Sequence, residues 1–407
     1  MVLKNPLPLG PITAPAEVSA MRIGVVKESD QETRVAIVPS SLRKLTKAGF
    51  EVVVESGAGL TSSHDDQAYI DAGASIGTRT EALSCPHVLS VGFPGVEGMA
   101  EGTNLVCVAD PFRHPDRVKA CMDAGITLMS MDMIPRRLSR AQSMDVNSSQ
   151  DNLAGYKAVL LGAAHVPKGI PMMTTSAGTV RPAKIVVMGS GVAGLQAIAT
   201  AKRLGAVVYA SDVRKSAAEQ IESVGGRFIE VDGMDDFEDA SGYAKPLTPE
   251  FIQKVNDTVC GVAQDADIII TTARIFGRPA PITVPASAVA NFKRGSVIVD
   301  MNADVGGNCE STKAGEIITT DNGVIVVGTS NLPGTLATTA SMLYSNNLTT
   351  FMCSLVNEGD VVVSEDDDIL VGAPEGSDFH VPGMGGVLIC KDGVVHPKQT
   401  RLSEVVA

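Results

Sequence analysis

A short apolar run followed by a glycine-rich loop and a helix most constrains the fold of this chain. Ile185 to Met188 is typical of a buried strand, Gly189-Ser190-Gly191-Val192-Ala193-Gly194 of a tight loop, and Leu195 to Leu204 of a helix. The first glycine permits the turn, the second lets a pyrophosphate approach the backbone, and the third lets helix and strand pack closely. The free N–H groups at the helix N-terminus favour phosphate. The pattern predicts a dinucleotide-binding sheet.

An aspartate stands where such a site needs an acid. A second strand, Val207 to Ala210, leads to Asp212, about 20 residues beyond the first glycine. Its carboxylate can accept hydrogen bonds from the adenosine ribose hydroxyls and repels a 2′-phosphate, so it favours NAD(H) over NADP(H). Arg214 is a weaker indication of the opposite preference, because an arginine can bind a 2′-phosphate. The cofactor-binding residues predicted in this half of the chain are Gly189, Gly191, Val192, Ala193, Gly194, Asp212, Val213, Arg214, Thr272 and Ala273.

Strand-like and helix-like segments alternate along the whole chain. Several of the strand-like runs are continuously apolar, as expected for strands buried on both faces of a parallel sheet. We therefore predict an α/β fold with two doubly wound, Rossmann-like parallel sheets joined by long helices. The expected strands are 22–26, 51–54, 88–91, 105–108 and 126–130 in the first half, and 185–188, 207–210, 228–230, 268–271, 296–300 and 324–327 in the second.

Two long helical patterns, 148–164 and 338–356, suggest how the domains are connected. The first would lead from one sheet into the next, and the second would return the chain to the first domain. The leader contains four prolines and lacks the apolar core of a signal peptide, so it is expected to be disordered. The predicted divisions are a leader (1–20), a discontinuous outer domain (21–147 and 331–407) and an NAD-binding domain (148–330).

The composition argues against several classes of function. With 33 Lys and Arg against 46 Asp and Glu, the formal net charge is −13, which leaves no basic surplus for a nucleic-acid backbone. The seven cysteines form no CxxC pair and the six histidines show no ligand spacing, so we predict no metal site. No apolar run reaches the roughly 18 to 20 residues of a membrane span. If the protein works at a membrane, other chains must supply the spans.

A polar segment ahead of the glycine loop is the second informative feature. It runs from Arg136 to Asp145 and continues through Ser148, Ser149 and Gln150, between apolar segments. If the glycine loop holds the phosphates of a cofactor, this segment is the candidate for holding its reactive end. The alternative is a solvated loop in which Ser148 or Ser149 caps the following helix.

Further motifs accompany this segment. They are Glu28-x-x-x-Glu32-x-Arg34-Val35-Ala36, Arg137-x-Ser139-Arg140-Ala-Gln142-Ser-Met-Asp145-x-x-Ser148-Ser149-Gln150, Asn152-Leu153-Ala154-Gly155-Tyr156, Met173-Thr174-Thr175-x-Ala177-Gly178-Thr179, Gly189 to Arg203, Asp212-Val213-Arg214, Gly242-Tyr243-Ala244-Lys245 and Gly306-Gly307-Asn308-Cys309. Over residues 21 to 355 the chain resembles the alpha subunit of proton-translocating NAD(P) transhydrogenases. Alanine dehydrogenases are similar in fold and share the N-terminal and glycine-loop motifs.

The resemblance implies hydride transfer from NADH to NADP+ held by a partner subunit, coupled to proton movement through a membrane-spanning subunit. It assigns Arg137, Gln142 and Asp145 to the catalytic loop that meets the nicotinamide. Gln142 and Ser148 would bind the carboxamide, and Arg137 and Asp145 would position the ring. Tyr243 would lie on a mobile loop that closes over the nucleotide. The resemblance also implies a homodimer and a cytoplasmic location at the inner face of the membrane, with NAD(H) on this chain and NADP(H) on the partner.

The first domain bears on the choice between this activity and that of an alanine dehydrogenase. Hydride transfer between two nicotinamides needs alignment and exclusion of water, without an acid or base. Oxidation of an amino acid needs a base and cations in the cleft. The lysine and histidine of alanine dehydrogenases are not in place in Val91 to Gly95 or Val108 to Pro111. His114 is offset in sequence, and we predict that it lies on the surface.

Two alternatives stay open at this stage. Arg34 matches the arginine that binds the substrate carboxylate in alanine dehydrogenases, so a soluble dehydrogenase of that type is the second hypothesis. The same arginine would be structural if it were paired with Glu28 or Glu32. A non-catalytic NAD-binding protein is the third hypothesis, because the chain departs from the transhydrogenase pattern at Val305, where a glutamate is usual, and at Pro333-Gly334-Thr335.

Overall fold

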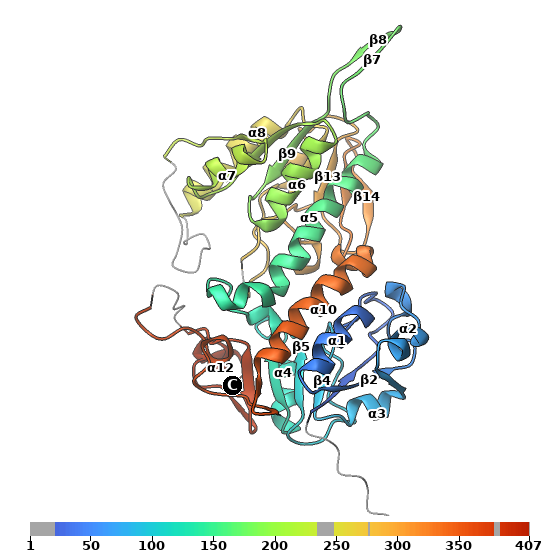
Figure 1. Ribbon diagram of the computed structural model, residues 1–407. Helices are drawn as coiled ribbons and strands as arrows, with labels where there is room; N and C mark the ends of the chain where they lie inside the picture. The colour runs from blue at the N-terminus through green and yellow to red at the C-terminus, as the bar shows by residue number, and fades with distance from the viewer. Residues whose placement is uncertain (1–20, 234–247, 276, 378–382, 407) are drawn as a thin grey trace, which may run out of the picture.

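The structure, a computed structural model, describes residues 21–233, 248–275, 277–377 and 383–406. It consists of two α/β domains that lie one above the other in Figure 1, each built around its own sheet. The leader 1–20, which the sequence predicts to be disordered, lies outside the described residues. Of the part of the chain that is described, no helix is long and apolar enough to cross a membrane.

The first sheet has eight strands in the order β19-β18-β6-β5-β4-β1-β2-β3. The six strands β1 to β6 run parallel, and the order reverses between β1 and β4. The strands β18 and β19 extend it antiparallel at one edge. Their bounds are β1 (Arg22–Val25), β2 (Glu51–Glu55), β3 (Ser75–Gly77), β4 (His87–Leu89), β5 (Asn104–Cys107), β6 (Thr127–Ser130), β18 (Leu388–Lys391) and β19 (Val394–Val395).

The second sheet has seven strands in the order β11-β10-β9-β12-β13-β15-β14. All of its neighbours are parallel except β14, which pairs antiparallel with β15. The order reverses between β9 and β12, where ligands bind in open sheets of this type. The bounds are β9 (Lys184–Met188), β10 (Val207–Ser211), β11 (Arg227–Phe228), β12 (Ile268–Thr271), β13 (Val297–Asp300), β14 (Ile317–Thr319) and β15 (Ile325–Val327).

The predicted strands all occur, with ends within two residues of those expected. The prediction of parallel sheets is correct for the centre of each sheet and incomplete at the edges. The edge strands β3 and β14 are short and contain no fully buried residue, so they lack the continuous apolar run that marks a central strand. Two small hairpins were also not predicted, β7 (Met173–Thr175) with β8 (Gly178–Val180), and β16 (Val356–Asn357) with β17 (Asp360–Val361).

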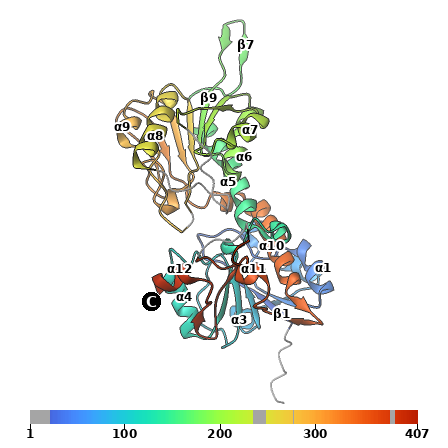
Figure 2. The same ribbon diagram turned by 90° about the vertical axis from the view of Figure 1, so that its left-hand side faces the viewer.

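Two long helices run between the domains, as Figures 1 and 2 show. They are α5 (Val146–His165) and α10 (Ala337–Ser354), which pack against each other and agree with the two helical patterns in the sequence. The first sheet takes strands from both ends of the chain. The exact domain boundaries remain a prediction. The other helices are α1 (Pro39–Lys47), α2 (Asp66–Asp71), α3 (Arg79–Leu83), α4 (Pro115–Asp123), α6 (Val192–Arg203), α7 (Ala217–Ser223), α8 (Pro249–Ala263), α9 (Ala286–Val289), α11 (Asp368–Val371) and α12 (Thr400–Val406).

Helix α10 carries buried hydroxyl groups that hold it to the first domain. The Ser341 Oγ accepts a hydrogen bond from the Val35 N–H, and the Ser345 Oγ accepts one from the Val38 N–H, both at 3.0 Å. The buried Tyr344 hydroxyl donates to the Ser90 carbonyl at 2.9 Å. Because a buried N–H without a partner is costly, these serines let an irregular segment after β1 lie inside the domain.

Helices α5 and α6 cross at backbone distance. Gly155 is buried in α5, and a Cβ placed on it would overlap the carbonyl oxygen of Ala193 in the first turn of α6. The glycine therefore lets α5 approach the helix that follows the glycine-rich loop. This crossing fixes the start of α6 relative to the polar segment that precedes α5.

We expect Gly155→Ala to destabilise the protein by about 1–3 kcal/mol, because the added methyl group overpacks the crossing. Gly261→Ala is the matched control: Gly261 lies in α8, and a Cβ there would meet no atom within 4 Å. That change removes a glycine from a helix and should be neutral or stabilising by up to about 1 kcal/mol. Urea unfolding followed by circular dichroism measures both. Equal stability of Gly155→Ala and the wild type would contradict the close crossing.

Candidate functional site

The glycine-rich loop follows β9 and opens into α6 as the sequence predicts. Gly189 has φ +103°, and a Cβ there would overlap the Thr272 hydroxyl. A Cβ on Gly194 would overlap the Gly189 carbonyl oxygen. By contrast, a Cβ on Gly191 would meet no atom within 4 Å. Two glycines are thus required by packing, and the third faces open space at the helix N-terminus. This arrangement fits a pyrophosphate, which the first N–H groups of α6, at Val192 and Ala193, can meet.

Asp212 lies just beyond β10 and is surrounded by hydrogen-bond donors. Its Oδ2 accepts from the Ser190 N–H at 2.9 Å and from the Ser190 hydroxyl at 2.7 Å. Arg214 donates from its N–H to Oδ1 at 3.0 Å, and its guanidinium reaches both oxygens at 2.9 and 3.0 Å. Burial alone would raise the pKa of Asp212, but Arg214 and the Ser190 hydroxyl hold that pKa below its usual range. The carboxylate is therefore charged, beside the glycine-rich loop.

The pairing with Arg214 was not predicted, and it changes the interpretation of the two residues. The sequence suggests that Asp212 binds ribose hydroxyls and that Arg214 weakly indicates a 2′-phosphate. In the structure the guanidinium is held on the aspartate, so a ribose would have to share or replace its donors. Val213 lies between them and is half-buried. The roles of all three in binding stay predictions.

The loop after β12 lies on the other side of the glycine-rich loop. The Thr272 hydroxyl donates to the Met188 carbonyl at 3.1 Å. The Ala273 carbonyl accepts from the side-chain amides of Asn302 at 3.0 Å and Asn308 at 2.8 Å. Thr272 and Ala273, predicted to bind cofactor, are thus held next to Gly189. In the sequence, Asn308 is identified only as one residue of a family motif. In the structure its buried side-chain amide holds the loop after β12 in place.

A polar cluster forms at the start of α5. Asp145 is the N-cap of the helix: it accepts hydrogen bonds from the Ser148 N–H at 2.9 Å and the Ser148 hydroxyl at 2.5 Å. The Arg136 guanidinium lies 3.3 Å from Asp145 Oδ2 and donates to the Ser148 Oγ at 2.6 Å. The alternative in which Ser148 or Ser149 caps this helix is wrong, because Asp145 is the cap. Arg136 was not predicted as a site residue, although it stands in the segment.

Arg137 and Gln142 have exposed side chains on the same segment. The segment that carries them includes the 3-10 turn Ser139–Met144, and two contacts hold this segment to α10 and α11. Arg140 forms ion pairs with Asp367 and Asp368 at the start of α11, and the Asn347 amide donates to the Ser143 carbonyl at 2.8 Å. A fixed backbone therefore presents Arg137 and Gln142 outward, while Asp145 is buried and Ser148 is half-buried.

Helix α5 links this cluster to the glycine-rich loop. Ser148, Asp151 and Gly155 follow at spacings of three and four residues, so they lie along one face of the helix. Gly155 touches α6, and Ser148 stands seven residues earlier, which corresponds to about 10 Å along the axis. The structure thus brings the predicted phosphate loop and the predicted ring-binding segment to one side of a single helix.

The crevice of the first sheet is filled by its own side chains. Glu28, after β1, accepts hydrogen bonds from the N–H groups of Val91 at 2.6 Å and Gly92 at 3.2 Å, at the point where the strand order reverses. Burial raises the pKa of Glu28 to about 7. Arg34 donates to both carboxylate oxygens of Glu32, at 2.8 and 2.7 Å, and the remaining nitrogen donates to the Gln150 amide oxygen at 2.8 Å. The pairing of Arg34 with Glu32 that the structural alternative requires is therefore present.

The two domains touch across the cleft near His114. The Arg113 guanidinium donates to the Asp304 carbonyl at 2.9 Å, and a Cβ on Gly277 would lie 3.1 Å from the Phe112 ring. His114 itself is half-buried at the start of α4, so the prediction of a surface residue is only partly right.

Two other predictions concern residues near the site. Tyr243 lies outside the described residues. Within residues 21–233, 248–275, 277–377 and 383–406, no group of three or more His, Cys, Asp or Glu is arranged to hold a metal ion.

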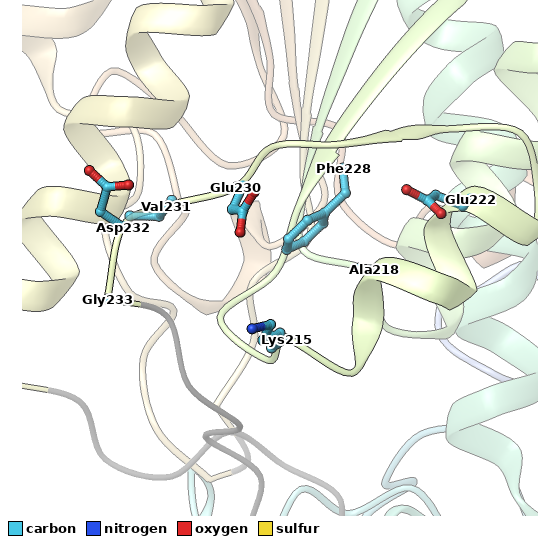
Figure 3. Close-up of a pocket in the computed structure, with 8 residues that line it drawn as sticks. All are labelled: Lys215, Ala218, Glu222, Phe228, Glu230, Val231, Asp232 and Gly233. Carbon is cyan, nitrogen blue, oxygen red and sulfur yellow. The ribbon is translucent and has the colours of Figure 1, made fainter.

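A hollow of about 410 Å³ begins at Lys215, the residue that follows Arg214 (Figure 3). It continues along α7 and β11. Three carboxylates and a single ammonium group line it, so it is a poor place for a phosphate. The lining residues are Lys215, Ala218, Glu222, Phe228, Glu230, Val231, Asp232 and Gly233.

The chain is similar to known proteins over most of its length. The family models for the alanine dehydrogenase/PNT N-terminal and C-terminal domains match residues 24–154 and 158–375. An NAD(P) transhydrogenase alpha-subunit chain of Rhodospirillum rubrum is 42% identical over 397 residues, covering 93% of this chain and 99% of the relative. The crystal structure of transhydrogenase from Sinorhizobium meliloti matches with a TM-score of 0.80 and 41% identity, covering 92% of this chain and all of that one. An L-alanine dehydrogenase structure matches with a TM-score of 0.72 and 25% identity, covering 95% and 100%.

Gly191→Ala should block nucleotide binding without loss of stability. The methyl group enters the space intended for the pyrophosphate, and it meets no protein atom within 4 Å. We expect NADH affinity to fall at least tenfold, about 1.4 kcal/mol, with an unchanged melting temperature. Gly194→Ala is the contrasting variant, because it should lower the melting temperature through its overlap with Gly189. Titration of NADH fluorescence and thermal unfolding test both, and unchanged NADH binding by Gly191→Ala would exclude this loop as the phosphate site.

Proposed function

Because the chain belongs to the NAD(P) transhydrogenase alpha subunits of the alanine dehydrogenase/PNT family, we propose that it binds NADH and transfers its hydride to NADP+ held by a partner subunit. In that reaction the C4–H bond of the dihydronicotinamide breaks with its electron pair, and a C–H bond forms at C4 of the second nicotinamide. NADH is oxidised to NAD+ and NADP+ is reduced to NADPH. No proton enters or leaves, so the site needs no acid or base.

The second domain would hold NAD(H). Gly191 and the first turn of α6 provide space and N–H donors for the pyrophosphate. The charged Asp212 supports a preference for NAD(H), since a 2′-phosphate would lie against its carboxylate. When bound, the cofactor supplies the hydride. The protein contributes orientation of the ring and exclusion of water.

The exposed polar segment would align the ring with the partner's cofactor. Residues that meet another subunit must be accessible, and Arg137 and Gln142 are. Asp145 and Ser148 are fixed by Arg136 and by the helix N-terminus, so they can place hydrogen bonds accurately. We assign Gln142 and Ser148 to the carboxamide, and Arg137 and Asp145 to positioning of the ring.

The observation that carries this assignment is the filled crevice of the first domain. An alanine dehydrogenase needs a cation free to bind a substrate carboxylate, together with a base. Here the guanidinium of Arg34 is bound on three sides by Glu32 and Gln150, and Glu28 occupies the N–H groups at the strand reversal. This geometry supports a reaction without a small amino-acid substrate in the chain's own cleft.

The assembly that we propose has a homodimer of this chain, an NADP(H)-binding subunit and a membrane-spanning subunit that couples the reaction to proton translocation. The dimer is supported by the β7–β8 hairpin, which projects away from the second domain in Figure 1. Its apolar side chains are exposed: Met172 by 66%, Met173 by 41% and Val180 by 40%. A two-stranded hairpin is marginally stable alone, so we expect a second copy of the chain to pack against it. The chain would lie at the inner face of the membrane through its partners.

A reconstituted exchange assay tests the function. The purified chain is mixed with a transhydrogenase NADP(H)-binding subunit, NADPH and a spectrally distinct NAD+ analogue. We expect rapid reduction of the analogue that requires both proteins. The chain alone should bind NADH and should not turn over pyruvate and ammonia. In Gln142→Ala the exchange rate should fall at least tenfold, about 1.4 kcal/mol of barrier, with NADH binding largely kept. Ser143→Ala, an exposed neighbour, is the control.

Each result of that assay separates the hypotheses. Turnover of pyruvate and ammonia without a partner would establish an alanine dehydrogenase. NADH binding without exchange, in the presence of a competent partner, would indicate a non-catalytic NAD-binding protein. Gln142 is preferable to Asp145 for this test, because loss of the N-cap Asp145 would also cost about 1 kcal/mol of stability.

Charged residues on the hairpin should dissociate the dimer. Met172→Asp with Met173→Asp places two carboxylates where apolar surface is expected to be covered. We expect a shift to monomer at micromolar concentration in analytical ultracentrifugation. Leu60→Asp changes an apolar residue in the first domain that is 60% exposed and should leave the dimer intact. A wild-type monomer, or a dimer insensitive to the hairpin change, would refute the hairpin interface.

A further inference from the structure

Asn331 joins the two domains where the chain passes from β15 into α10. It stands just before the 3-10 turn η5 (Pro333–Leu336), and its φ of +47° is a left-handed conformation in which asparagine is enriched. The chain departs from the transhydrogenase pattern in this turn, at Pro333-Gly334-Thr335. The proposed hydride transfer uses neither Asn331 nor the departure.

The N–H and the side-chain amide of Asn331 have partners in both domains. The N–H donates to Asp304 Oδ2 in the second domain at 2.9 Å, and Nδ2 donates to Glu32 Oε2 in the first domain at 3.1 Å. Oδ1 accepts from the Gly334 N–H at 3.1 Å, which fixes the orientation of the amide. The Thr33 hydroxyl donates to the Gly334 carbonyl at 2.5 Å. One residue thus links both domains and the turn between them.

Gly334 leaves the space that the Asn331 amide occupies. It is buried, and a Cβ on it would lie 2.5 Å from Asn331 Nδ2 and 2.8 Å from Cγ. A side chain at position 334 would therefore push the amide away from Glu32. The departure at Gly334 and the contact between Asn331 and Glu32 are thus two parts of one feature.

Glu32 extends the connection to α5. It accepts hydrogen bonds from Arg34, which in turn donates to the Gln150 amide oxygen at 2.8 Å. Gln150 also donates to the Ala340 carbonyl of α10 at 3.2 Å. Burial alone would raise the pKa of Glu32, but Arg34 and Asn331 hold that pKa below its usual range. A charged carboxylate therefore lies between the first domain, α5 and the turn.

Asp304 belongs to the segment that holds the loop after β12. Its carbonyl accepts a hydrogen bond from Arg113 of the first domain at 2.9 Å, and four residues later Asn308 donates to the Ala273 carbonyl at 2.8 Å. The polar segment, by contrast, is held by α10 and α11. The hydrogen bonds of Asn331 therefore connect the supports of the two places where a dinucleotide would be held.

We propose that Asn331 is a positioning residue for the dinucleotide: it fixes the angle between the domains, so that the polar segment meets the nicotinamide of a cofactor whose phosphates lie at α6. The inference rests on the proposed NAD(H) binding. Without the contact between Asn331 and Glu32, the first domain can turn about α5 and α10, the two helices that run between the domains. The polar segment then moves away from the ring, while the adenosine and the pyrophosphate keep their contacts with the second domain.

Two single changes disturb this contact without altering a residue assigned to the cofactor. Asn331→Asp places a carboxylate against that of Glu32, and Gly334→Ala displaces the Asn331 amide. We expect each to weaken NADH binding about tenfold, and to slow exchange with the NADP(H)-binding subunit at saturating NADH about tenfold, because the ring is misplaced. The affinity for ADP-ribose, which lacks the nicotinamide, should stay within about twofold of the wild type.

A rescue variant and a matched control separate positioning from a general loss of stability. In Asn331→Asp with Glu32→Gln the donor and the acceptor exchange places, so NADH affinity should return to within about threefold of the wild type. Asn322→Asp makes the same change at an asparagine whose amide donates to the Val289 and Phe292 carbonyls, inside the second domain. It should lower the melting temperature and leave NADH affinity unchanged.

Isothermal titration of the full chain with NADH and with ADP-ribose, together with thermal unfolding and the exchange assay, provides the test. Equal weakening of NADH and ADP-ribose binding by Asn331→Asp would overturn the inference, because it would reflect damage to the second domain. Unchanged NADH binding in Asn331→Asp and Gly334→Ala, or no rescue by Glu32→Gln, would also overturn it and leave the proposed function intact. Absence of NADH binding by the wild type would instead refute the proposed function, and this inference with it.

Discussion

The crossing of α5 and α6 at Gly155 is the contact on which the geometry of the site depends. It brings two helices to backbone distance, so no side chain separates the helix that starts at the polar cluster from the helix that starts at the glycine-rich loop. The positions of their N-termini are thereby fixed relative to each other. Ser148 lies about 10 Å from the crossing along the axis of α5. A dinucleotide is long and flexible, and holding both of its ends requires a rigid distance between the two binding points. In the proposed function one helix, α5, provides that distance, and α10 packs against it.

The two sheets share a topology and differ in what occupies their crevices. In the second sheet, Gly191 leaves open space at the strand reversal. In the first, Glu28 occupies the corresponding N–H groups, and Arg34 is committed to Glu32 and Gln150. The second domain thus has room for a ligand at its strand reversal, whereas the first domain's own side chains occupy the corresponding place. This division supports the proposal that a fold shared with alanine dehydrogenases here carries a reaction whose second substrate comes from outside the chain.

Local signals in the sequence account for much of this structure. The turn at Gly189, the approach at Gly194 and the acid at Asp212 follow from the needs of a dinucleotide site, and all three lie within one strand–loop–helix–strand unit or directly after it. Continuous apolar runs are enough to identify the central strands. The features that were not predicted depend on residues far apart in the chain. Arg140 pairs with Asp367 and Asp368, and β18 adds to β6 across more than half of the sequence. No local pattern encodes such partners. The capping role of Asp145 was missed for a different reason, because the same residue type suits a cap and a binding site.

Arginines paired with carboxylates at the site reduce the repulsion between an acidic chain and an anionic cofactor. A chain with a formal charge of −13 has to bind an anionic dinucleotide, and carboxylates at the site would add to the repulsion. Two carboxylates there are each accompanied by an arginine: Asp212 by Arg214 and Asp145 by Arg136. In the proposed function these carboxylates supply acceptors for hydroxyl and amide groups, while the arginines offset their negative charge near the phosphates. Both carboxylates are held by several short hydrogen bonds, so the acceptors keep their positions while their charge is balanced locally.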